Sequence, residues 1–111
     1  MIEIEILEPN AIYKIDNIVN GEKEEVTLHI RYLNVAQMWI FDFASPTNSE
    51  FCVRLVCNTK ILYDRYNFEL IVTDNNNTGL DTFLEDDFTT GRYTLYFLAH
   101  DFTEDIKNVA L

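Results

Sequence analysis

Apolar and polar residues alternate with a period of two through most of this 111-residue chain. Residues 26–32 show the pattern most clearly, since every second side chain from Val26 to Tyr32 is apolar or aromatic. A period of two indicates a β-strand with one face in a core and the other in solvent. The same pattern recurs in further runs, at residues 2–6, 13–16, 51–56, 68–72 and 93–97.

Turn-forming residues separate these runs. All three glycines and both prolines lie in polar breaks, at Gly21, Gly79, Gly91, Pro9 and Pro46. Such punctuation is typical of antiparallel strands joined by short turns. We therefore predict an all-β fold, a small antiparallel β-sandwich or barrel of about seven to nine strands, in a single domain over residues 1–111.

Helix signals are confined to two short segments. Residues 80–88 are compatible with at most one short helix or turn, in which Phe83, Leu84 and Phe88 would face inward. The tail, residues 104–111, suits either a short helix or a last edge strand.

The charge balance is strongly acidic, with 19 acidic against 8 basic residues and a formal net charge of −11. Such a surface repels phosphate, so neither nucleic acid nor an anionic membrane is expected as a partner. No apolar run is long enough to span a bilayer. The first ten residues alternate isoleucine with glutamate and lack a basic start, so we expect no signal peptide there.

The two cysteines are Cys52 and Cys57. If residues 50–57 form one strand, the odd spacing places the two side chains on opposite faces, roughly 16 Å apart along it. They are then unable to form a disulfide with each other. Two thiols at this spacing are not a metal-site signature either. We expect two small buried hydrophobic residues in a reducing compartment.

Residues with catalytic potential are few. His29 falls in the middle of a predicted strand, and His100 follows another. Nucleophilic catalysis needs a Ser, Thr or Cys beside a base, but Ser45 and Ser49 lie in one predicted turn without an elbow motif. We therefore expect no catalytic residues, no cofactor and no enzymatic activity.

An acidic loop partly fits a calcium-binding pattern. Asp74, Asn76 and Thr78 occupy the spacing of first, third and fifth ligands, and Glu85 that of the twelfth. Asp81, however, stands at a normally apolar position, and the flanks do not predict a helix pair. We favour an ordinary loop between strands without a bound metal, and keep a calcium site as the alternative.

Two predicted strands are apolar on both faces, at residues 38–43 and 93–98. A half-exposed sheet has one polar face, so these strands require another explanation. Either they are central strands whose outer face is covered, or they form an interface with a partner. In the second case the anchors would be Trp39, Phe41, Tyr96 and Tyr32.

Several short motifs follow one another in a distinctive order. Residues 30–34 read Ile-Arg-Tyr-Leu-Asn, and residues 37–42 read Gln-Met-Trp-Ile-Phe-Asp. Four motifs follow: Val-Arg-Leu-Val from residue 53, Ile-Leu from residue 61, Phe-Glu-Leu-Ile-Val-Thr-Asp from residue 68 and Arg-Tyr-Thr-Leu-Tyr-Phe from residue 92. Over residues 12–99 this order resembles the Arg-Tyr-Asn…Trp…Asp hairpin and following strands of phage baseplate plug proteins. The chain departs from the family pattern at two places. Leu33 separates Tyr32 from Asn34, whereas in the family the asparagine usually follows the tyrosine directly. Residues 47–50 stand where the family often has a glycine-rich segment.

The resemblance implies a non-enzymatic structural component of a tailed-phage baseplate, docked at the central hub, tube or spike. It implies a role in closing or organising the axial channel, and a location in the virion after synthesis in the host cytoplasm. Other baseplate proteins would be the partners, and a homo-oligomer within the particle is allowed. The alternative is a stand-alone β-sandwich module that binds carbohydrate or calcium. Arg31 and Arg54 would pair across strands with carboxylates such as Asp42.

Overall fold

The computed structural model describes residues 2–19, 21–62, 66 and 68–99 of the chain. Within these residues the fold is all-β and contains no helix, so no helix in the described part is long and apolar enough to cross a membrane. The strands are β1 (Ile2–Ile4), β2 (Asn10–Val19), β3 (Glu22–Leu33), β4 (Met38–Ala44), β5 (Ser49–Arg54), β6 (Lys60–Ile61), β7 (Phe68–Asp74) and β8 (Tyr93–Ala99).

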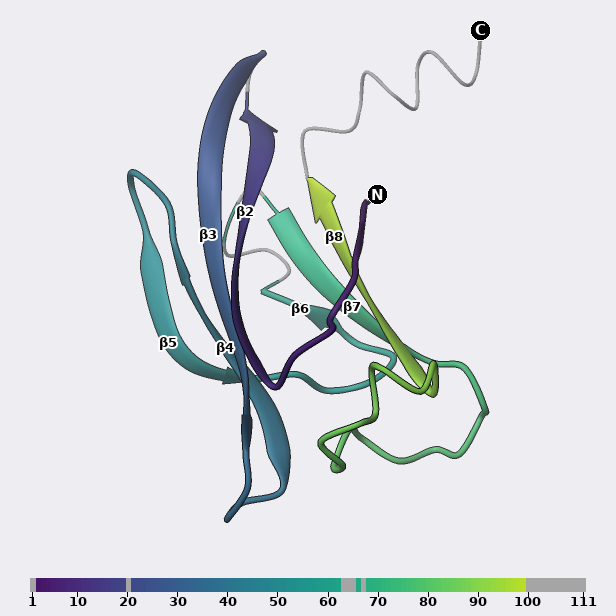
Figure 1. Ribbon diagram of the computed structural model, residues 1–111. Helices are drawn as coiled ribbons and strands as arrows, with labels where there is room; N and C mark the ends of the chain where they lie inside the picture. The colour runs from purple at the N-terminus through teal and green to yellow at the C-terminus, as the bar shows by residue number, and fades with distance from the viewer. Residues whose placement is uncertain (1, 20, 63–65, 67, 100–111) are drawn as a thin grey trace, which may run out of the picture.

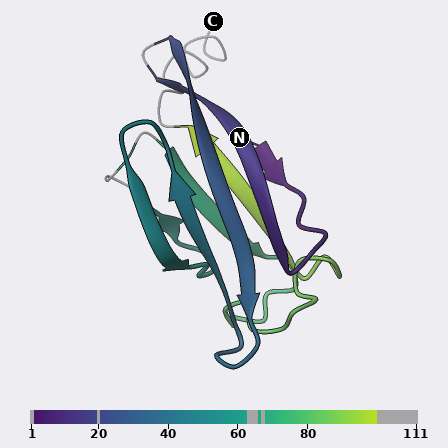
Figure 2. The ribbon, with the colours of Figure 1, turned by 60° about the vertical axis from the view of Figure 1, so that its left-hand side comes forward.

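The strands form two antiparallel four-stranded sheets in the orders β1-β8-β7-β6 and β2-β3-β4-β5. Figures 1 and 2 show the two sheets packed face to face, with β3 and β4 in one layer and β7 and β8 in the other. This arrangement confirms the predicted class and is a sandwich, in which β1, β6, β2 and β5 are the edge strands among the described residues.

The inward faces of both sheets supply one hydrophobic cluster. Leu28 and Ile30 of β3 are fully buried, as is Leu95 of β8, which agrees with the period-two pattern of their runs. An aromatic contact ties the sheets together, because the Phe43 ring meets the edge of Phe68 with ring centroids 5.1 Å apart. Edge-to-face aromatic pairs of this kind stabilise a core beyond the area that they bury.

The two strands with apolar residues on both faces, β4 and β8, are central in their sheets. Trp39, Ile40 and Phe41 of β4 are all buried. The interface prediction is therefore corrected for Trp39 and Phe41, whose side chains point into the core and are not available to a partner. Tyr32 and Tyr96 are half-buried.

The predicted strand at residues 50–57 ends early, at Arg54. The register of β5 against β4 shifts at a bulge between Phe41 and Phe43, and Cys52 has a positive φ of 57°. Cys57 lies beyond the strand and forms an isolated bridge with Val72 of the other sheet. Both cysteines are free, but neither is fully buried as predicted. Cys52 lies at the bulge and is exposed, so its predicted burial is wrong, and Cys57 is only half-buried.

Residues 80–88 contain no helix, since 80–83 are irregular and 84–88 form a bend followed by turns. Phe88 is buried and Leu84 half-buried, as predicted, but Phe83 is 40% exposed. Hydrogen bonds to both its backbone N–H and its carbonyl hold Phe83 in place and leave its side chain facing solvent. The predictions for His100 and for residues 104–111 fall outside the described residues.

Candidate interaction site at the β7–β8 loop

The longest connection between strands joins β7 to β8 and comprises residues 75–92, here called the β7–β8 loop. It lies beside the β3–β4 turn at one end of the sandwich (Figure 1). Two aromatic side chains of the opposite sheet hold it there. The Tyr32 hydroxyl donates to the Phe83 carbonyl at 2.7 Å, and the Trp39 indole Nε1–H donates to the Leu84 carbonyl at 3.0 Å.

A buried carboxylate organises the loop from within. Asp87 is 0% exposed, and its Oδ2 accepts hydrogen bonds from the backbone N–H groups of Phe83 at 2.7 Å and Leu84 at 2.8 Å. Its Oδ1 accepts from the Arg92 guanidinium, at 3.1 Å from Nε. A buried charge is tolerated only when it is paired and hydrogen-bonded in this way. Asp87 therefore fixes both the turn before it and the start of β8.

The first part of the loop is closed by Asp74, the last residue of β7. Its Oδ2 accepts from the backbone N–H of Gly79 at 2.7 Å and from the Thr78 hydroxyl at 3.1 Å. Further along, Asp81 Oδ1 accepts from the backbone N–H of Cys57 at 2.9 Å and ties the loop to the segment after β5. Each of these hydrogen bonds anchors the loop through a polar group that folding would otherwise leave unpaired.

The four predicted calcium ligands do not converge. Asp74 and Thr78 bond to each other, Asn76 is exposed, and Glu85 lies in a different part of the loop, beside residues 7–9. Within the described residues no group of three or more His, Cys, Asp or Glu side chains is arranged to hold a metal ion.

The environment of Asp74 lowers the pKa of its carboxyl. Burial alone would raise this pKa, but the hydrogen bonds from Gly79, Thr78 and Asn76 favour the charged form and outweigh burial. A folded-state pKa below the unfolded value means that the charged carboxylate stabilises the fold above about pH 3.9, and that this stabilisation is lost as the pH falls through the folded pKa.

An Asp74→Asn variant is therefore expected to be less stable than the wild type near neutral pH, and the difference should shrink below about pH 4. Urea unfolding of both proteins at neutral pH and at about pH 3 measures the free-energy gap directly. A gap of equal size at the two pH values would contradict this assignment.

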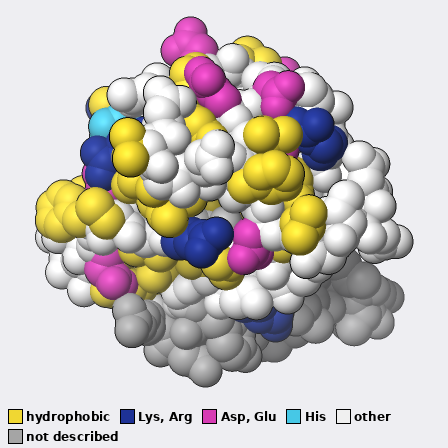
Figure 3. All heavy atoms as spheres, turned by 90° about the horizontal axis from the view of Figure 1, so that it is seen from below, with side chains coloured by type: hydrophobic (Ala, Val, Ile, Leu, Met, Phe, Trp, Pro, Cys, Tyr) yellow, Lys and Arg dark blue, Asp and Glu magenta, His cyan; other side chains and the backbone are white. Residues whose placement is uncertain are grey.

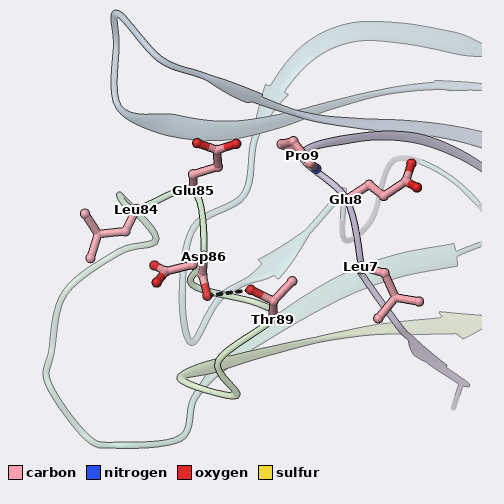
Figure 4. Close-up of a pocket in the computed structure, with 7 residues that line it drawn as sticks. All are labelled: Leu7, Glu8, Pro9, Leu84, Glu85, Asp86 and Thr89. Atoms are coloured by element: carbon pink, nitrogen blue, oxygen red, sulfur yellow. Dashed lines mark hydrogen bonds between the residues drawn. The ribbon is translucent and has the colours of Figure 1, made fainter.

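A cleft of about 510 Å³ lies between the chain before β2 and the second half of the loop, lined by Leu7, Glu8, Pro9, Leu84, Glu85, Asp86 and Thr89. Figure 4 shows the two walls facing each other, with the carboxylates of Glu8 and Glu85 on opposite sides. Tyr32 braces both walls, because its backbone N–H also donates to the Pro9 carbonyl at 2.7 Å.

The charges in the cleft are mostly uncompensated. Asp86 pairs with Arg92 at 2.6 Å, whereas Glu8 and Glu85 make no ion pair with any described residue. Leu7, which lines the cleft, is an exposed apolar side chain, and so are Leu80 and Phe83 of the β7–β8 loop. Seen from below, hydrophobic side chains are interspersed with acidic and basic ones over this face (Figure 3). The chemistry suits a basic partner that also offers apolar contacts.

A polar cluster on the outer face of β3 and β4 has a structural role. Arg31 pairs with Asp42 at 3.1 Å, which confirms the predicted cross-strand pairing for Arg31. Arg54, for which the same pairing was predicted, forms no ion pair with a described residue. The Asp42 carboxylate also accepts from the backbone N–H of Cys52 at 2.7 Å, and so holds the bulge of β5. His29 lies beside this cluster, with Nδ1 3.8 Å from Asp42 and Nε2 2.5 Å from the Asn10 amide oxygen.

Cys57 is not a poised nucleophile. Burial, followed by the nearby charges of Asp81 and Asp74, raises the pKa of its thiol to about 11. Since the thiolate is the reactive form, the raised pKa keeps this thiol protonated and weakly nucleophilic near neutral pH.

Comparison of the sequence with models of known protein families and with curated proteins finds no match. The fold and the site therefore define only a class, an antiparallel β-sandwich with a braced loop and an acidic cleft at one end.

Two features of the site were not predicted from the sequence. The cleft joins residues 7–9 to residues 84–89, which are far apart in the chain and share no motif. Asp87 is one of three consecutive acidic residues, and nothing in its spacing separates it from its exposed neighbours Glu85 and Asp86.

Proposed function

We propose that this chain is a non-enzymatic structural component of a phage tail baseplate. It docks at the central hub or tube through the cleft between residues 7–9 and 84–89, and helps to close or organise the axial channel. The observation that carries the docking site is the cleft itself, whose two opposite walls carry the uncompensated carboxylates of Glu8 and Glu85 beside the apolar residues Leu7, Pro9 and Leu84.

The rigidity of the cleft favours protein binding. Its walls are held by bonds from Tyr32, Trp39 and Asp87, so little conformational entropy is lost when a partner docks. The net charge of −11 favours a basic partner surface and speeds encounter with it.

The proposal that the chain belongs to a baseplate rests on the resemblance of its sequence to plug proteins. Two of the residues that carry it, Tyr32 and Trp39, are the ones that hold the β7–β8 loop in place. The motif therefore has a physical task in this fold, which is to shape the end of the sandwich that bears the cleft.

The carbohydrate-binding alternative has less support. Stacking of a sugar needs an exposed aromatic platform, but the single tryptophan, Trp39, is 1% exposed. The exposed aromatic rings of the described residues, Phe51 and Phe83, belong to separate elements, β5 and the β7–β8 loop. The calcium-dependent form of this alternative would need ligands that the described residues do not bring together.

Binding of the purified chain to the hub, tube and spike proteins encoded beside it tests the proposal. We expect one of them to bind, and Glu85→Lys to weaken that binding by at least about ten-fold, since the change reverses a charge inside the cleft. Glu22→Lys is the matched control, because it makes the same charge change at the exposed β2–β3 turn, at the far end of β3 (Figure 1). Binding to none of these proteins would refute the function, and equal weakening by both variants would refute the cleft as the docking site.

A further inference from the structure

The four sheet edges of the sandwich differ sharply in length and regularity. β1 has three residues, β6 has two, and β5 carries a bulge against β4. Short or bulged edges of this kind resist pairing with another chain. β2 is the exception, with ten residues that pair in unbroken register with β3 from Asn10 to Val19.

The opposite edge of β2 pairs with no other strand of the described chain. Figures 1 and 2 both show β2 at the margin of its sheet. A long, regular edge without proline presents a row of backbone N–H and C=O groups that another strand can bind.

The outer face of β2 has a self-complementary sequence. Ile12, Lys14, Asp16 and Ile18 alternate along this face, and all four side chains are exposed. Inside the sheet Asp16 lies opposite Glu25, a like-charge pair, so its own sheet offers it no cation at that position. A cation on the free side of β2 would relieve this repulsion.

We propose that two copies of the chain form a symmetric dimer by antiparallel pairing of β2 with β2 of the second copy, about a two-fold axis at Ile15. In this register Lys14 lies opposite Asp16 of the second copy, and Ile12 lies opposite Ile18 of the second copy. Each contact occurs twice, as the isologous interface of a two-fold dimer requires. The two β2-β3-β4-β5 sheets become one continuous eight-stranded sheet.

Neighbouring registers do not place opposite charges and apolar side chains against each other in this way. An axis at Lys14 places Lys14 opposite itself and Ile12 opposite Asp16, and an axis at Asp16 places Asp16 opposite itself. A slip by one residue would set an inward face against an outward face. Only the axis at Ile15 pairs opposite charges and apolar side chains at once, so the sequence of β2 selects both the partner and the register.

Charge-swap variants of the full-length chain test the dimer, with mass measured by sedimentation equilibrium up to millimolar concentration at physiological salt. Lys14→Asp and Asp16→Lys each replace both attractive pairs by repulsive ones and are expected to weaken dimerisation by roughly ten- to thirty-fold. Neither endangers the fold, because both side chains are exposed and a lysine at position 16 would face Glu25. Glu22→Lys makes the same charge change as Asp16→Lys but lies outside the two Lys14–Asp16 and two Ile12–Ile18 contacts, so it should leave the dimer intact.

Two combinations make the test specific to this register. The double variant Lys14→Asp/Asp16→Lys restores opposite charges and should dimerise again. An equimolar mixture of the two single variants should form a heterodimer, since one copy then offers two aspartates and the other two lysines. A wild-type chain that stays monomeric throughout the concentration range would overturn the proposal. So would a dimer that the single variants leave unchanged, or single variants that fail to combine.

Discussion

Replacing Asp87 with alanine is expected to lower the free energy of unfolding by about 2–4 kcal/mol. The change removes a fully buried carboxylate and leaves the N–H groups of Phe83 and Leu84 without their acceptor. Arg92 loses its buried partner as well, although its half-exposed guanidinium can still reach Asp86 and water. The β7–β8 loop should loosen, so its backbone amides should exchange with solvent faster than those of β3.

Asp86→Ala is the matched control for this prediction. Asp86 precedes Asp87 and pairs with the same arginine, but its side chain is 60% exposed. Exposed ion pairs contribute about 0–1 kcal/mol, so the control should be nearly as stable as the wild type. Urea unfolding of the three proteins gives the comparison. Equal stability of the two variants would show that Asp87 does not organise the loop.

Trp39→Ala is expected to cost about 3–5 kcal/mol, the range for deleting a large aromatic side chain from a core. Trp39 contacts the Tyr32 ring at a centroid distance of 5.5 Å and the Phe88 ring at 5.1 Å, and its indole N–H holds the Leu84 carbonyl. The variant leaves a cavity and an unpaired carbonyl at the same point. The cleft walls should lose their order together with the core beneath them.

Phe51→Ala is the control for Trp39, because it also removes an aromatic ring from a strand of the same sheet. Phe51 is 74% exposed, so its loss should change the free energy of unfolding by no more than about 0.5 kcal/mol. Denaturation followed by far-ultraviolet circular dichroism avoids reliance on tryptophan fluorescence. A Trp39 variant as stable as the Phe51 variant would contradict the assignment of Trp39 to the core.

Period-two alternation was a good guide to the strands, because it reports which side chains share a face. It located the buried faces of β3 and β8, and the runs with two apolar faces proved to be central strands. The Arg31–Asp42 pair was also predictable, since Arg31 lies on the polar face of residues 26–32 and Asp42 is the only carboxylate of the adjacent run 38–43.

The alternation of apolar and polar residues did not predict the backbone conformation where a tertiary contact determines it. Cys52 occupies an apparently regular strand position, yet Asp42 on the neighbouring strand captures its backbone N–H and a bulge forms. Phe83 turns outward because Tyr32 and Asp87 bind its backbone. The cleft depends on how the chain before β2 meets the β7–β8 loop, which periodicity within either segment does not encode.

Chemical cross-linking of the purified tail particle whose genome encodes this chain tests the proposed function most directly. A reagent that joins carboxylates to amines, followed by mass spectrometry, identifies both the partner and the face that it meets. We expect peptides in which Glu8 or Glu85 is joined to a lysine of a hub, tube or spike protein. Absence of the chain from the particle would contradict the account, as would cross-links that arise only from the opposite end of the sandwich, at Glu22.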